Sequence, residues 1–430
     1  MKWWVALLAL VLVALFGSLG VLYVRTFVVH RAHGVILFVA DGLDLSLLNK
    51  AREQAAARGQ GLHIDSLNQI AVLEVEGLGQ PVPDAAAAST ALACGQRVRN
   101  GLIGQSADGT HLTSLIYAAQ RAGRATGLVT TRELTAPTPL AFYGQARVGE
   151  PGYEQRAATD LLYSGINIIL GGGAQYFTPA DVANEKGRTD GHNLITEAEE
   201  RGYTVVRHAQ ELNHIPTWWT HHLFGLFAPG SLSFSALHQG ASTQPTLEDM
   251  TRMAINCLEH NTRGYFLVID QGRIEGAARH NWTSLALDEV AALDAAISTA
   301  QAYAGKGSLV MVTNGFSLGT LDQAGDETSS PALAPAPHAL TPVSGVEWLS
   351  GPGGPPLTEE DRLWLRKQTE RGLFSPDSMS LLHPTPAVRF ARHAEVTREP
   401  AWLGAGGFGA EAFAGFISND QVSGLIQTLF

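Results

Sequence analysis

Short runs of apolar residues that alternate with amphipathic stretches constrain the fold of this chain more than any other feature. The runs have the length of buried strands and lie at residues 35–40, 126–130, 166–170, 265–269 and 308–313. Apolar strands that alternate with helices are typical of a largely parallel sheet with helices packed on it. We therefore predict a globular domain of the α/β class over residues 34–430.

Each predicted strand ends in polar residues or glycines. These strand ends are Asp41-Gly42, Thr131-Arg132, Gly171-Gly172-Gly173, Asp270-Gln271-Gly272 and Asn314-Gly315. Ligand sites in sheets of this kind lie beyond the carboxyl ends of the strands. We therefore expect the functional side chains at this edge of the sheet.

The composition excludes two classes of protein. With 45% hydrophobic and only 16% charged residues, the chain is not intrinsically disordered. The formal net charge of −11, from 40 acidic and 29 basic side chains, argues against nucleic acid as a partner, because phosphate binding needs a basic face.

The two cysteines, Cys94 and Cys257, are too few for a disulfide framework, and we expect both to be small buried side chains.

Residues 3–24 form an uncharged apolar run that follows Lys2. Crossing a bilayer takes about 20 apolar residues, whereas the apolar part of a signal peptide has about 7–15. We therefore predict an N-terminal transmembrane anchor over residues 1–25. A signal peptide is the alternative, because Ser18-Leu19-Gly20 could serve as a weak cleavage site. We expect the globular domain close to the membrane on its exported face, periplasmic or extracellular.

Residues 322–387 differ in composition from the rest of the domain. Proline, glycine, alanine and serine are frequent over residues 322–356, which is typical of irregular surface structure. A short helix is predicted to follow, with Thr358 and Asp361 at its start and Gly372 at its end. We interpret the whole segment as a Pro/Gly-rich insertion within the domain.

Four segments resemble the alkaline phosphatases in sequence, order and spacing. They are residues 35–43 (VILFVADGL), 84–95 (DAAAASTALACG), 168–173 (IILGGG) and 272–281 (GRIEGAARHN). The resemblance covers about residues 34–317 and 388–430 and implies a three-layer α/β/α sandwich. It also implies the family's chemistry: hydrolysis of phosphate monoesters by a serine between two zinc ions, with magnesium nearby and an arginine that holds the phosphate.

The position of the nucleophile holds a residue that cannot react. In the family a serine directly follows an aspartate at the start of a helix. Here Asp84 is followed by Ala85, and a methyl group cannot attack phosphorus. Ser89 and Thr90 lie more than a turn further along the predicted helix, so we interpret them as packing hydroxyls.

The position that resembles the family's phosphate-binding arginine has changed as well. It holds Glu150, three residues before Tyr153, while Arg147 lies nearby but displaced. A carboxylate repels phosphate. We therefore expect this loop to contribute no phosphate clamp.

The zinc positions implied by the resemblance are largely lost. One site would have Glu275, Arg279 and Val396 in place of an aspartate and two histidines. The other keeps Asp41 but has Gly315-Phe316 in place of an aspartate-histidine pair, and neither residue offers zinc a side-chain ligand. We therefore expect no bound zinc. Because Arg279 follows Glu275 by four residues, we predict a helical ion pair that replaces one zinc charge.

The magnesium position implied by the resemblance is partly kept. Its ligands correspond to Asp41, Thr138 and Asp270, with aspartate where the family has glutamate, while Ala136 replaces another acidic residue common there. Oxygen ligands from strand ends suit a hard cation that keeps several waters. A residual magnesium site, with Glu275 beside it, is therefore left open.

These losses predict a membrane-anchored, alkaline phosphatase-like pseudoenzyme that has no catalytic residue and serves as a structural or scaffold subunit of a membrane-associated complex. The expected partners are the membrane, through the N-terminal helix, and protein subunits or a second copy of the chain. One alternative is a magnesium-dependent phosphoester hydrolase with a reduced site at Asp41, Thr138, Asp270 and Glu275. The other is a protein that binds a phosphorylated ligand without cleaving it.

Overall fold

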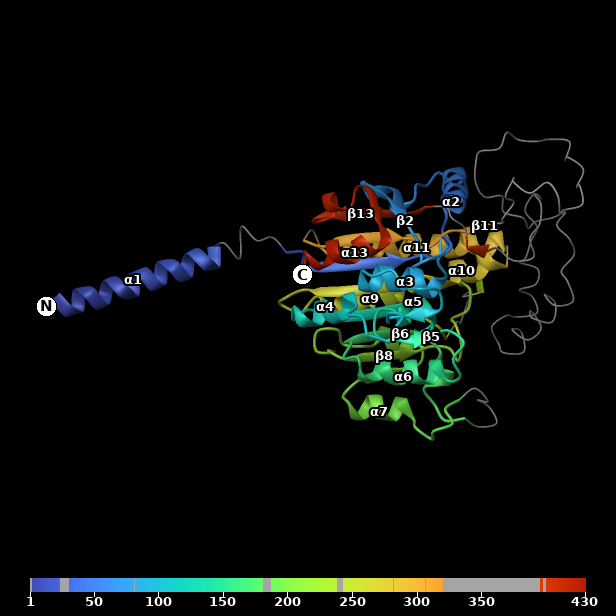
Figure 1. Ribbon diagram of the computed structural model, residues 1–430, viewed down its shortest axis with the longest axis horizontal. Coiled ribbons are helices and arrows are strands. Elements are labelled where there is room, and N and C mark those ends of the chain that lie inside the picture. Colours follow the sequence, from blue (N-terminus) through green and yellow to red (C-terminus); the bar gives the residue numbers. More distant parts are fainter. Residues whose placement is uncertain are drawn as a thin grey trace, which may run out of the picture.

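One mixed sheet forms the centre of the molecule, a computed structural model that describes residues 2–23, 31–80, 82–180, 187–237, 243–280, 282–305, 307–319, 395–396 and 400–430 (Figure 1). Within these residues the sheet has ten strands in the order β14-β2-β13-β10-β1-β9-β4-β6-β8-β7. Only β13 runs against its neighbours. The largely parallel sheet predicted from the apolar runs is thereby confirmed.

The strands of the large sheet coincide closely with the predicted apolar runs where these exist. Their bounds are β1 Gly34–Val39, β2 Gln69–Glu74, β4 Ala125–Glu133, β6 Ile168–Gly172, β7 Thr204–Val206, β8 Leu223–Leu226, β9 Tyr265–Asp270, β10 Leu309–Thr313, β13 Ala401–Gly407 and β14 Gly415–Ser418. Two small sheets pair β3 (Leu102–Ile103) with β5 (Ala146–Arg147) and β11 (Leu318–Gly319) with β12 (Glu395–Val396).

Helices cover both faces of the sheet, so that the domain has three layers (Figure 1). On one face lie α2 (Leu45–Ala57), α9 (Leu247–Leu258), α10 (Gly272–Arg279) and α11 (Thr283–Tyr303). On the other lie α3 (Ala85–Cys94), α4 (Leu115–Arg121), α5 (Pro137–Leu140), α6 (Tyr153–Tyr163), α7 (Leu194–Glu200) and α13 (Asn419–Gln427). A five-residue helix, α8 (Ala209–Asn213), precedes β8.

Alternate side chains of each central strand pack into the two helix layers. In β1, Ile36 and Phe38 belong to the core under α9 and α11, whereas Val35 and Leu37 belong to the core under α3 and α4. Strands buried on both faces need apolar residues at every position. Cys257 is buried and Cys94 is half-buried, and both are free thiols.

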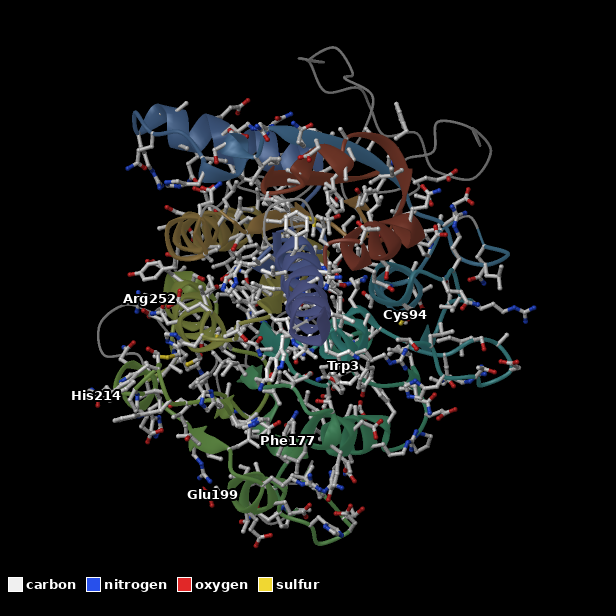
Figure 2. The ribbon with its side chains drawn as sticks, turned by 90° about the vertical axis from the view of Figure 1, so that its left-hand side faces the viewer. Trp3, Cys94, Phe177, Glu199, His214 and Arg252 are labelled. Carbon is white, nitrogen blue, oxygen red and sulfur yellow. The ribbon has the colours of Figure 1, made fainter. Side chains whose placement is uncertain are left out.

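The predicted N-terminal anchor lies in helix α1 (Lys2–Tyr23), which projects away from the domain on the side where β1 begins (Figures 1 and 2). In the part of the chain that the structure describes, no helix is long and apolar enough to cross a membrane. Membrane attachment therefore stays a prediction from the sequence. The predicted insertion over residues 322–387 lies outside the described residues.

Candidate functional site

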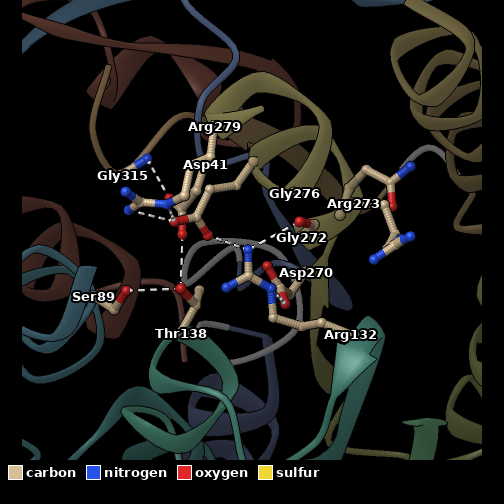
Figure 3. A network of polar contacts seen from close by, with 12 residues as sticks. Asp41, Ser89, Arg132, Thr138, Asp270, Gly272, Arg273, Gly276, Arg279 and Gly315 are labelled. Carbon is tan, nitrogen blue, oxygen red and sulfur yellow. Dashed lines mark hydrogen bonds and ion pairs between the residues drawn. The ribbon is translucent and has the colours of Figure 1, made fainter. Parts of the chain in front are cut away.

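The predicted site residues converge at the carboxyl edge of the sheet, opposite the end from which α1 projects (Figures 1 and 3). Register explains the convergence, because Val39 of β1 lies beside both Asp270 of β9 and Thr313 of β10. Asp41 and Gly315 follow these positions by two residues. Helix α10 starts just after β9 and brings Glu275 to the same place.

Asp41 is fully buried and both of its carboxylate oxygens accept hydrogen bonds. The hydroxyl of Thr138 donates to Oδ2 at 2.7 Å, and the backbone amide of Gly315 donates to Oδ1 at 3.0 Å. Ser89 in turn donates to the Thr138 hydroxyl at 3.1 Å. Burial, together with the nearby carboxylates of Glu275 and Asp270, raises the pKa of Asp41 to about 7.

Asp270 ends β9 and is also fully buried. Its register partner Thr130 donates a hydrogen bond to Oδ2 at 2.6 Å, and Nε of Arg132 lies 3.5 Å from the same oxygen. Oδ1 of Asp270 is buried and has no hydrogen-bond partner among the described residues. Burial raises the pKa of Asp270, although the charge of Arg132 opposes this shift.

Glu275 lies between two guanidinium groups, those of Arg132 and Arg279. Nη2 of Arg132 donates to Oε2, while Nε of Arg279 donates to Oε1 at 2.6 Å from the next turn of α10. Burial alone would raise the pKa of Glu275, but the charges of Arg132 and Arg279 outweigh it and lower this pKa. The guanidinium of Arg279 also lies 5.9 Å from the ring centroid of the buried Phe316.

Arg132 is the site residue that sequence reasoning missed. It lies near the end of β4, where its guanidinium reaches Asp270 and Glu275 and also donates to the carbonyl of Gly272 at 3.0 Å. Burial disfavours the charged form of Arg132, but the carboxylates of Glu275, Asp270 and Asp41 outweigh burial and raise its pKa. The available signal was its position in one of the polar strand ends, Thr131-Arg132.

Ala85 is the first residue of α3, directly after the helix-capping Asp84. The Asp84 carboxylate accepts hydrogen bonds from the amides of Ala87 at 2.8 Å and Gly101 at 2.7 Å. The helix therefore starts at the position that the sequence predicts, with a methyl group where a nucleophile would stand. Within the described residues, the Ser89 hydroxyl is buried against Thr138.

Thr90 and Glu150 are not part of this cluster. The Thr90 hydroxyl is buried and donates to the carbonyl of Leu102 at 3.3 Å. Glu150 is exposed, and its Oε2 forms an ion pair with Nη2 of Arg156 at 3.0 Å. Nε of Arg147 lies 3.6 Å from Oε1 of Glu150. These contacts place Glu150 in a surface charge pair.

The residues at the carboxyl edge do not fit the metal centre that the family resemblance implies. Gly315 and Phe316 have no side-chain atom that could bind a metal ion. Arg132 and Arg279 place positive charges beside Glu275, where a metal ion would otherwise lie. In the described part of the chain, no three His, Cys, Asp or Glu side chains are grouped so that they could hold a metal ion. Val396 belongs to β12, which pairs with β11.

A cavity of about 310 Å³ lies beside the cluster. Its lining includes three arginines, Arg132, Arg273 and Arg279, and three glutamates, Glu133, Glu154 and Glu275. Three positive and three negative side chains therefore face this cavity, and two of the arginines, Arg132 and Arg279, already pair with Glu275.

Comparison with known proteins identifies the family. The family model for alkaline phosphatase matches residues 32–339, and the chain belongs to this family. It is 30% identical over 329 residues to a membrane-bound alkaline phosphatase of Bombyx mori, which covers 66% of this chain and 60% of that protein. Alkaline phosphatase 4 of Bacillus subtilis is 35% identical over 250 residues, covering 55% of this chain and 51% of that protein. The chain thus spans about three fifths of the silkworm relative's length.

Solved structures share the fold. Alkaline phosphatase of Thermus thermophilus superposes with a TM-score of 0.71 at 23% identity, covering 93% of this chain and 92% of that one. The enzyme of the Antarctic bacterium TAB5 gives 0.67 at 20% identity, covering 93% and 98%. A variant of the TAB5 enzyme was solved with Mg bound in its M3 site. The α/β fold predicted from the resemblance is therefore the fold of this family.

Proposed function

We propose that this member of the alkaline phosphatase family does not hydrolyse phosphate esters and serves as a structural or scaffold subunit. The observation that carries the proposal is Ala85 at the capped start of α3, where the family's mechanism needs a nucleophile. A helix N-terminus attracts phosphate through its free amides. Without an attacking oxygen, that attraction supports binding at most.

The carboxyl edge of the sheet supports the same proposal. The positions that would hold zinc carry Gly315, Phe316 and Arg279, and the carboxylates that remain are engaged by Thr138, Arg132 and Arg279. Two-metal hydrolysis needs ions that stabilise both the attacking and the leaving oxygen. The ion pairs at Glu275 compensate its buried charge without a metal ion, which is compatible with a role that needs no catalysis.

The scaffold role includes attachment to a membrane through the N-terminal segment and association with protein subunits or a second copy of the chain. The silkworm relative is named as membrane-bound, which supports the first part by analogy. If α1 is the anchor, the polar edge of the sheet faces away from the membrane, because α1 projects from the other end (Figure 1). Partners would then reach this edge from the aqueous side.

The alternative function with a specific observation in its favour is a reduced, magnesium-dependent hydrolase. That observation is Oδ1 of Asp270, a buried carboxylate oxygen without a hydrogen bond in the described part of the chain. Such an atom is a potential ligand for a hard cation. The same assay tests both functions.

The test is hydrolysis of p-nitrophenyl phosphate by the purified full chain, with and without added Mg²⁺ and Zn²⁺. We expect a rate equal to that of buffer under all conditions, in the native protein and in matched Ala85→Gly and Asp41→Asn variants. Turnover that either variant abolishes would overturn the proposal. For the scaffold role, we expect protein gently solubilised from its native membrane to have the mass of a complex of fixed stoichiometry, and a lone chain would contradict it.

A further inference from the structure

We infer that Arg132 is a built-in cation, whose guanidinium takes the place of a divalent metal ion among Asp41, Asp270 and Glu275, and that its removal alone creates a divalent-cation site there. The inference rests on the proposed loss of metal-dependent catalysis. It names the group that replaced the metal ions and is tested by cation binding. The inference can therefore be wrong even if the protein is shown to be inactive.

The Arg132 guanidinium lies between the two buried carboxylates of Asp270 and Glu275. Nε of Arg132 lies 3.5 Å from Oδ2 of Asp270, and Nη2 donates to Oε2 of Glu275. One planar group therefore spans two carboxylates that come from different elements, β9 and α10 (Figure 3). A metal ion in a carboxylate site makes the same kind of link.

Arg132 also supplies positive charge to a cluster of buried carboxylates. Asp270 is fully buried and the side chain of Glu275 is only 7% exposed. Within the described residues, Arg279 forms an ion pair with Glu275 but not with Asp270, and its side chain is 39% exposed. Buried carboxylates without a nearby cation repel one another and lose hydration. Among the described residues, Arg132, with a side chain 13% exposed, is the cation that contacts both Asp270 and Glu275.

The backbone next to Arg132 leaves room for its side chain. A Cβ atom at Gly272 would lie 1.8 Å from Nε of Arg132, so a side chain there would displace the guanidinium. The carbonyl of the same glycine accepts a hydrogen bond from Nη2 at 3.0 Å. The start of α10 is therefore built to receive an arginine.

Loss of Arg132 would leave carboxylate oxygens that can bind a cation. Oδ1 of Asp270 is buried without a hydrogen bond among the described residues, and Oε2 of Glu275 would lose its donor. The adjoining cavity of about 310 Å³ is lined by both Arg132 and Glu275, so an ion and its waters can enter the space that the Arg132 side chain would leave. Carboxylate oxygens with retained waters are the ligands that Mg²⁺ prefers.

The experiment measures the melting temperature of the full chain in EDTA and in increasing MgCl₂. For the native protein we expect the same Tm in both. For Arg132→Ala we expect a lower Tm in EDTA that rises by several degrees, saturably, as Mg²⁺ binds the folded state. Arg273→Ala is the matched control, because Arg273 lines the same cavity but stacks 3.5 Å from the ring centroid of Phe234. We expect its Tm not to respond to Mg²⁺.

A double variant keeps the inference testable if Arg132→Ala does not fold. If Arg132→Ala does not fold in EDTA, we expect it to fold when MgCl₂ is present. Arg132→Ala with Asp270→Asn removes one carboxylate together with its cation, so we expect it to fold without a metal ion and to bind Mg²⁺ at least tenfold more weakly than Arg132→Ala does. Isothermal titration with MgCl₂ measures this for each folded variant. The inference is overturned if the native Tm responds to Mg²⁺ or EDTA, or if the folded Arg132→Ala variant gains no response. Hydrolysis by the native protein would instead overturn the proposed function.

Discussion

The backbone amide of Gly315 donates a hydrogen bond to Oδ1 of Asp41 at 3.0 Å. The alkaline phosphatases that this sequence resembles have a metal-binding side chain after the strand, at the position of Gly315. Here the backbone itself satisfies the buried carboxylate, and a Cβ atom at Gly315 would lie 2.6 Å from the same oxygen. The contact therefore depends on glycine at this position.

Gly315→Ala is expected to destabilise the domain by about 1–3 kcal/mol, the usual cost of forcing extra atoms into a packed site. Urea denaturation followed by circular dichroism measures the change. Gly424→Ala is the matched control, because a Cβ atom at Gly424 would meet nothing within 4 Å. In the interior of α13 this control should stabilise by about 0.5–1 kcal/mol. Equal effects of the two substitutions would refute the steric argument.

Arg279→Ala is expected to destabilise the domain by about 1–2 kcal/mol, because Glu275 loses a charged hydrogen-bond donor while it keeps Arg132. A shift in the urea midpoint at constant slope would measure the loss. Arg156→Ala is the control, since the Arg156–Glu150 pair is exposed on both sides and should be worth about 0–1 kcal/mol. An unchanged stability in Arg279→Ala would show that Arg279 does not replace a metal charge.

Most of the fold could be predicted from the sequence because buried parallel strands are read directly as apolar runs. The run at residues 265–269, for example, became β9 (Tyr265–Asp270), with every residue buried. Polar residues at strand ends then located the site, because parallel strands bring their carboxyl ends to one edge. Asp41 and Asp270 could be placed there for that reason.

The role of Arg132 could not be predicted, for a physical reason. The pairing of β4 with β6 shifts register between Val129 and Glu133, and irregularities of this kind re-aim side chains near sites. Between these two positions β4 advances by four residues while β6 advances by two, from Leu170 to Gly172, so the side chains in between do not follow a regular strand pattern. Neither the local sequence nor the family resemblance contains that information. The same holds for the Gly315 amide, whose direction depends on the turn after β10.

Stability is expected to fall as pH rises because of Glu289, a buried carboxyl in α11. Its oxygens accept hydrogen bonds from the Ser235 amide at 2.5 Å, the Ser235 hydroxyl at 3.1 Å and Nε2 of Gln271 at 2.8 Å. Burial raises its pKa, although the Ser235 amide and the charge of Arg273 oppose the shift. The folded state therefore binds the proton more tightly than the unfolded state does. The stability that the protonated Glu289 side chain contributes to the folded state is complete below the usual glutamate pKa, and it is lost as pH rises through the raised pKa.

The measurement is the free energy of unfolding between pH 4 and pH 8 for the native protein and Glu289→Gln. The variant cannot ionise, so its stability should fall less steeply with pH than that of the native protein. The pKa values of Asp41 and Asp270 are also raised, but they affect the pH dependence of both proteins in the same way. The difference between the two slopes of stability against pH therefore isolates Glu289. Parallel slopes would contradict the prediction.

Ala85→Ser is expected to leave the protein inactive even though it restores an oxygen at the start of α3. A serine hydroxyl becomes a useful nucleophile only when a base or a metal ion lowers its pKa, and the ligands for such ions are missing at Gly315 and Phe316. The substitution should change stability by less than about 0.5 kcal/mol, because Ala85 is only half-buried. The check is release of p-nitrophenol with Zn²⁺ and Mg²⁺ present, with unsubstituted protein as the baseline. A metal-dependent rate above that baseline would mean that the alanine alone had silenced a working site, and that Arg132 and Arg279 do not exclude the ions.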